Sequence, residues 1–112
     1  MKLNIKKCKI GGTYYDIKYC DDLRDEKNLQ LDGRAMESKT LIKVDTKRQN
    51  YQGQLRTLIH EIVHCLIWEY NLMKIKKDED LSVMLTTAFL AFIIDNPKII
   101  HKILDFYQTK RK

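Results

Sequence analysis

Two histidines four residues apart flank a glutamate in the segment His60-Glu61-Ile62-Val63-His64. In a helix, residues at positions i and i+4 lie one turn apart on one face, so both imidazoles can reach a single metal ion. The glutamate points about 100° further around the helix, beside the metal, where it can take a proton from a water molecule. The spacing therefore predicts a zinc site with His60 and His64 as ligands and Glu61 as the general base of a peptide hydrolase.

The residues around the motif favour a helix that carries it. His64 falls about 40° from His60 on a helical wheel, and apolar side chains fill the other side. These are Leu55, Leu58, Ile59, Ile62, Val63, Leu66 and Ile67. The histidines would then lie at the edge of the buried stripe, where the wall of a cleft would be. The alternative is an ordinary helix whose two histidines are satisfied by backbone groups or water.

The size of the chain indicates one domain, covering residues 1–112. It has 112 residues, of which 44% are hydrophobic and 32% charged, as in an ordinary globular protein. No apolar run reaches the roughly eighteen residues that cross a bilayer, and the N-terminus has no apolar signal segment. We therefore expect a cytoplasmic protein with no membrane partner.

The cysteines and the net charge suggest no further site. Cys8, Cys20 and Cys65 are odd in number, widely spaced and form no CxxC pair, which argues against disulfides or a thiolate zinc site. The net charge of +6 raises the alternative of nucleic-acid binding through phosphate neutralisation. The lysines are scattered and no nucleic-acid motif accompanies them, so we interpret them as solvated surface.

The order of elements predicts an α+β fold. Residues 1–45 read mainly as strands: Lys2 to Ile10, a Gly11-Gly12 turn, Thr13 to Tyr19, and Thr40 to Val44. We expect three or four strands in a small twisted sheet, antiparallel or mixed. The HExxH helix should span 51–70, an apolar helix 78–95, and a last helix 97–108 that opens at Pro97. The helix at 78–95 is apolar on nearly every side, so we expect it to be buried against the motif helix.

Several segments together resemble a known family. They are LDG, LIKVD, TLIHEIVHCLIWEYNL and DEDLSVMLTTAFLAFIIDNP. They resemble small zincin-like proteins of phages and prophages of Gram-positive bacteria, which are related to the ImmA/IrrE-like metallopeptidases. The resemblance covers nearly the whole chain and implies a minimal zincin domain with Zn²⁺ as cofactor. It also implies a third ligand glutamate near the start of the helix after HExxH, and the position that fits is Glu79.

Physical reasoning also leads to the first turn of that helix for a third ligand. A catalytic zinc takes three protein ligands and one open position. Asp78, Glu79 and Asp80 are the acids available there, with Glu79 the predicted ligand, Asp80 the alternative and Asp78 an N-cap. Some ImmA/IrrE-like sequences place the glutamate deeper, in a Glu-x-x-Ala-Asn pattern. The comparable stretch here, Val83 to Thr87, has no acid, and that register would leave only two protein ligands.

Two functions follow from these residues. The first is a zinc-dependent peptidase that acts on a protein or peptide substrate, for example a phage regulatory protein. The second is a catalytically inactive zincin-like binding module in which zinc is structural or absent. The donor that stabilises the transition state is not identified by the sequence. Its candidates are Tyr14, Tyr15, Tyr70 and His101.

Overall fold

The computed structural model describes residues 2–111 and confirms the α+β class, with strands in the first half and helices in the second. Two single-turn 3₁₀ helices, η1 (Glu37–Lys39) and η2 (Leu72–Lys74), lie in connections. The strands are β1 (Lys7–Ile10), β2 (Thr13–Cys20), β3 (Gly33–Met36) and β4 (Leu41–Asp45), and the helices are α1 (Tyr51–Glu69), α2 (Asp78–Asp95) and α3 (Pro97–Arg111).

The four strands form one mixed sheet in the order β1-β2-β4-β3. β2 and β4 are parallel, whereas β1 pairs with β2 and β3 with β4 in antiparallel fashion. The hairpin between β1 and β2 turns at Gly11, whose φ of 60° suits a residue without a side chain, as the Gly-Gly pair predicted. The edge strand β3 was not among the strands that the sequence predicted.

The first strand is shorter than expected. Only Lys7–Ile10 forms the ladder, although the prediction began at Lys2. The preceding segment still joins the core, since Leu3 and Ile5 are buried and the Tyr19 hydroxyl donates to the Ile5 carbonyl at 2.7 Å. The alternating apolar residues thus marked burial correctly but not strand pairing.

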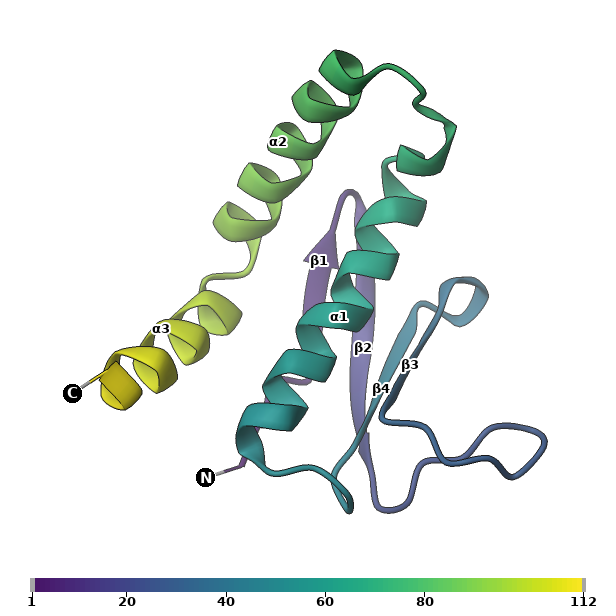
Figure 1. Ribbon diagram of the computed structural model, residues 1–112, viewed down its shortest axis with the longest axis vertical. Helices are drawn as coiled ribbons and strands as arrows, with labels where there is room; N and C mark the ends of the chain where they lie inside the picture. Colours follow the sequence, from purple (N-terminus) through teal and green to yellow (C-terminus); the bar gives the residue numbers. More distant parts are fainter. Residues whose placement is uncertain (1, 112) are drawn as a thin grey trace.

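Helix α1 lies across one face of the sheet (Figure 1). It begins at Asn50, whose side chain accepts a hydrogen bond from the Gly53 N–H at 2.9 Å. Its inner stripe packs with alternate residues of the strands, which is the period expected of a sheet covered on one face. The buried residues of this contact include Leu58, Ile62, Cys65, Tyr15, Ile17, Ile42 and Val44.

The expectation that α2 is buried against the motif helix is wrong. Only Ala88 and Phe92 of this helix are buried, and its main contact in the sheet is β1. Figure 1 shows α2 descending beside the sheet on the β1 side. Apolar residues on every side of a helix do not indicate which side packs against the rest of the chain. In α2 only one narrow stripe is covered. The capping prediction was also wrong, because Lys77 is the N-cap and Asp78 the first helical residue.

A single side chain fixes the junction of α2 and α3 to the sheet. The Asn96 Oδ1 accepts from the Lys9 N–H at 2.7 Å, and its Nδ2 donates to the Lys9 and Phe92 carbonyls at 2.7 and 3.0 Å. The two helices meet there at 89°. Within residues 2–111 no single helix has both the length and the apolar character to cross a membrane. α2 and α3 reach those values only when taken together across their bend.

Candidate metal centre

His60 and His64 lie on the exposed side of α1 with their rings close together. Their Nε2 atoms are 3.2 Å apart, and the ring planes are nearly perpendicular at 81°. A tetrahedral zinc ion bound by two imidazoles at about 2.0–2.1 Å requires a separation of roughly 3.3 Å between the two nitrogens. The distance between the two nitrogens therefore matches that of a shared zinc ion.

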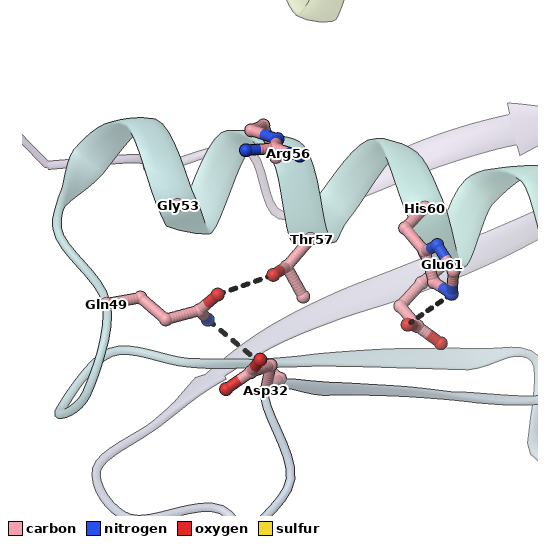
Figure 2. A pocket seen from close by; sticks show the side chains of 7 residues that line it. All are labelled: Asp32, Gln49, Gly53, Arg56, Thr57, His60 and Glu61. Atoms are coloured by element: carbon pink, nitrogen blue, oxygen red, sulfur yellow. Dashed lines mark hydrogen bonds and ion pairs between the residues drawn. The ribbon is translucent and has the colours of Figure 1, made fainter.

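Glu61 completes a three-residue cluster with the histidines. Its carboxylate lies 4.0 Å from the Nε2 of His60, and one donor atom from each of the three residues lies within 4.8 Å of the others. The histidines are exposed, whereas Glu61 is buried. Figure 2 shows its side chain below the helix, on the side of the strands. This arrangement places the carboxylate beside the predicted metal position, as a general base requires.

The edge strand β3 makes room for this carboxylate. A Cβ atom on Gly33 would lie 2.4 Å from the Cγ2 of Thr57 and 3.1 Å from the Cγ of Glu61. Any side chain at Gly33 would therefore push α1 or Glu61 away from the sheet. Two residues further along the strand, the Ala35 backbone lies close enough to the Glu61 carboxylate to act on its pKa. Glycine at this point of β3 thus leaves room for the Glu61 side chain.

Burial raises the pKa of Glu61 above that of an ordinary glutamate. The neighbouring His60 and His64 and the hydrogen bond from Ala35 act in the opposite direction. A carboxylate with a raised pKa is a stronger base than an exposed one. This is the direction that proton transfer near neutral pH needs.

Three depressions meet at His60. One, of about 460 Å³, lies between α1 and the segment around Asp32 (Figure 2). A second, of about 540 Å³, lies between β3 and the two histidines. Trp68 also lines it, and its ring stacks on that of His64 with 6.0 Å between the ring centroids. A third, of about 420 Å³, is walled chiefly by apolar side chains of α1 and α3, including Ile59 and Ile103. The cluster of His60, Glu61 and His64 therefore lies on a surface that has room for a peptide on either side of His60.

Strand β3 and the loop between β2 and β3 contribute polar residues that the sequence did not single out. Asp25, Glu26 and Arg34 line the depression next to β3, and the guanidinium of Arg34 pairs with Glu26 at 2.7 Å. This pair holds the pKa of Glu26 below its usual range. No motif marked these residues, because they reach the site only through the pairing of β3 at the sheet edge.

A buried carboxylate anchors this loop to the start of α1. Asp45 is fully buried and accepts hydrogen bonds from the Leu23 and Arg48 N–H groups, both at 2.8 Å. Arg48 in turn pairs with Asp22 and donates to the Leu23 and Leu31 carbonyls at 2.9 Å. The loop that borders the candidate site is therefore tied to the helix that carries it.

Glu79 and Asp80, the predicted third ligand and its alternative, do not join the cluster. Both are exposed in the first turn of α2, and neither belongs to the group of donor atoms formed by His60, Glu61 and His64. The prediction assumed that α2 covers the histidine side of α1, whereas α2 lies against β1. In the described part of the chain the histidine pair has no third ligand from α2.

The candidate transition-state donors also lie elsewhere. The Tyr15 hydroxyl donates to Glu69 at 3.0 Å, and Tyr14 is exposed. His101 borders a pocket formed with the N-terminal lysines, and Tyr70 packs near the β1–β2 turn. None of the four lines a depression that contains His60 or His64. Arg34 and Arg56 do line such depressions.

Comparison of the chain with protein-family models, with curated proteins and with solved structures finds no match. The resemblance to the ImmA/IrrE-like metallopeptidases stays a prediction, which rests on the HExxH motif and its flanking segments.

Proposed function

We propose that this protein is a zinc-dependent metallopeptidase. The observation that carries the proposal is the 3.2 Å separation of the His60 and His64 Nε2 atoms, with the buried Glu61 carboxylate beside them. A purely structural zinc site needs no general base. A buried carboxylate next to the metal ligands can act as the general base of hydrolysis.

In this proposal His60, Glu61 and His64 of α1 have different roles. His60 and His64 hold zinc, which when bound acidifies water and polarises the carbonyl of a peptide bond. Glu61 accepts the proton of the attacking water and later delivers it to the leaving amine.

The edge of β3 supplies a place for the substrate. Among residues 2–111, strand β3 pairs with β4 on one side only, so an extended peptide could pair with part of its other edge. This edge borders the depression that contains His60, Glu61 and His64. A peptide added along β3 would carry its backbone past the general base, which favours an unfolded or extended protein segment as substrate.

The test separates zinc binding from hydrolysis. Zinc content is measured by elemental analysis on the wild type, His64→Ala and Glu61→Gln, and cleavage is followed by mass spectrometry of an unfolded peptide mixture. We expect about one zinc per chain in the wild type and in Glu61→Gln, little in His64→Ala, and cleavage by the wild type alone. Cleavage that persists in Glu61→Gln would contradict the mechanism.

A second candidate is a zincin-like module without catalysis. The observation that favours it is the position of Glu79, which leaves the two histidines without the third protein ligand of a catalytic site. Glu79→Ala distinguishes the two candidates. Loss of zinc and of cleavage in that variant would mean that α2 reaches the histidines in the active protein. A zinc-free wild type that cuts no peptide would support the module.

A further inference from the structure

The helices leave one face of the four-stranded sheet open. The shortest extent of the molecule, 22 Å, holds one layer of helices about 10–12 Å thick on one sheet. Figure 1 shows α1 in front of the strands and α2 and α3 beside them, and among residues 2–111 no helix covers the opposite face. Side chains that alternate along the strands with the core residues point to that face. We call it the open sheet face, and it includes Lys7, Lys9, Tyr14, Asp16, Lys18 and Lys43.

The register of the sheet places like charges opposite one another on this face. Lys18 of β2 is the partner of Lys43 in β4, and Lys43 is in turn the partner of Arg34 in β3. Like charges directly opposite on neighbouring strands destabilise a sheet. Arg34 pairs with Glu26, whereas Lys18 and Lys43 have no ion pair in the described part of the chain. An anion bound between these two lysines would remove their repulsion.

One carboxylate lies among the cations of the open sheet face. Asp16 is the register partner of Lys7, and its carboxylate lies 3.8 Å from the Lys7 ammonium, with the two side chains 60% and 61% exposed. An ion pair this exposed contributes little, because water screens it. The lysines of this face therefore keep a positive excess that a ligand can neutralise.

The positive charge continues past the edge of β1 into a cleft of about 580 Å³ between the N-terminal segment and α3. It is lined by Lys6, Lys7, Lys98, Lys102 and His101, with Asp105 as an acid. Both walls are fixed, since the Ile17 N–H donates to the Lys6 carbonyl at 2.8 Å and Ile99 of α3 is buried in the core. A cleft lined mainly by one sign of charge concentrates ions of the other sign. Lysines that are scattered along the sequence are thus gathered by the fold.

An aromatic ring stands exposed among these cations. Tyr14 of β2 exposes 60% of its surface, and the Lys9 ammonium lies 5.9 Å from the centroid of its ring. Unpaired bases stack on rings of this kind while neighbouring cations hold the phosphates. The bases of a duplex are already stacked on one another, so Tyr14 favours a single strand over a duplex.

We propose that the open sheet face and the cleft beside β1 bind a single-stranded nucleic acid, with the lysines on its phosphates and Tyr14 stacked on one base. The proposal does not rest on the metallopeptidase, because His60 and His64 lie on the exposed side of α1, across the sheet from this face. An anionic membrane would attract the same lysines. However, the exposed apolar side chains that could enter a membrane lie chiefly on α2 and not on the open sheet face.

The experiment measures fluorescence anisotropy of a labelled oligothymidine of about twenty nucleotides, titrated with the whole protein at several salt concentrations. The wild type should bind it more tightly than a duplex of the same length. The logarithm of Kd should rise with the logarithm of the salt concentration at a slope of roughly 3, as expected for about four neutralised phosphates.

A pair of charge reversals locates the binding surface. Lys18→Glu should weaken binding at least about 10-fold, because it places a carboxylate beside the phosphates. The matched control is Lys74→Glu at an exposed lysine of η2, which changes the net charge equally but lies outside the proposed surface. It should change Kd by no more than about twofold, since distant exposed charges are screened by salt.

Substitution of Tyr14 tests the stacking. Tyr14→Ala should weaken binding at least about fivefold, whereas Tyr14→Phe should retain it, since stacking needs the ring and not the hydroxyl. Circular dichroism of each variant confirms that the fold is intact. The absence of binding at low salt, equal losses in Lys18→Glu and Lys74→Glu, or tighter binding to the duplex would overturn the proposal. Binding to phosphatidylserine vesicles in place of the oligonucleotide would do so as well.

Discussion

Gly33 is the residue on which the position of Glu61 depends most directly. We predict that Gly33→Ala destabilises the fold by about 1–3 kcal/mol, since the new methyl group overlaps Thr57 and crowds Glu61. Displacing Glu61 should also lower any peptidase activity while the zinc content holds. Urea unfolding measures the stability, and elemental analysis measures the zinc.

The control for this substitution is Gly12→Ala in the β1–β2 turn. A Cβ atom there has nothing within 4 Å, so the change in stability should stay within about 0.5 kcal/mol. Equal stability losses at the two glycines would mean that backbone entropy, rather than the contact with Thr57, governs position 33. A Gly33→Ala protein as stable and active as the wild type would remove β3 from the account of the site.

The buried thiols predict a pH dependence. Burial raises the pKa of Cys8 and of Cys65 from 9.0 to about 12, and that of Tyr19 from 10.0 to about 12. The folded chain therefore holds these protons in a range where the unfolded chain releases them. Their contribution to stability is complete below about pH 9 and is lost as the pH rises towards 12. Urea midpoints should stay level from pH 8 to about pH 9 and fall from there to pH 11.

Alkylation gives an independent reading of the same thiols. At pH 8 a thiol of pKa about 12 reacts roughly a thousandfold more slowly than one of pKa about 9, because its thiolate fraction is that much smaller. Iodoacetamide should modify Cys20 first, because this residue is partly exposed, and should modify the buried Cys8 and Cys65 only after unfolding. Mass spectrometry that finds all three modified together in the native protein would contradict the burial of the thiols.

At the scale of elements, Asn96 connects helices α2 and α3 to the sheet. Its amide makes two hydrogen bonds to the Lys9 backbone at 2.7 Å, as a neighbouring strand would. We predict that Asn96→Ala costs about 1–3 kcal/mol, because the Lys9 groups lose their partner. Hydrogen exchange should speed up in β1 and at the α2–α3 junction. Asn4→Ala, at an exposed residue, is the control and should leave exchange unaltered.

The elements show where sequence patterns carry information and where they do not. The helix around His60 was predictable because its apolar stripe has a clear period, and its observed bounds agree with the prediction to one residue. β3 was not predictable, because its four residues are all half-buried and show no alternation of buried and exposed positions. The packing of α2 was mistaken because its apolar residues surround the whole helix, so the pattern could not indicate which side the chain covers.

The same distinction applies to the candidate site. Residues close in sequence, His60, Glu61 and His64, were found from their spacing, which a helix converts directly into proximity. Glu79 depended on how two helices pack, which no local pattern determines. Gly33 and Ala35 depended on sheet register, and no signal in the chain identified them as neighbours of Glu61.

At the scale of the molecule, bound zinc should stabilise the fold. A metal that binds only the folded chain adds about 2.7 kcal/mol at one hundred times its dissociation constant, which is about 10 °C in Tm for a domain of this size. His64→Ala should abolish the shift with zinc in differential scanning calorimetry. His101→Ala on α3 is the control and should retain it. An equal zinc shift in both variants would indicate binding outside the cluster.

The contact between Gly33 and Glu61 also has an evolutionary consequence. Selection for hydrolysis would act on the two positions together, because a side chain at position 33 and a base at position 61 compete for one space. Thr57 lies closer still, so a lineage that lost the reaction would keep glycine at position 33 until position 57 also changed. Descendants with a large residue at 33 should therefore be those in which both Thr57 and the glutamate of HExxH have been replaced.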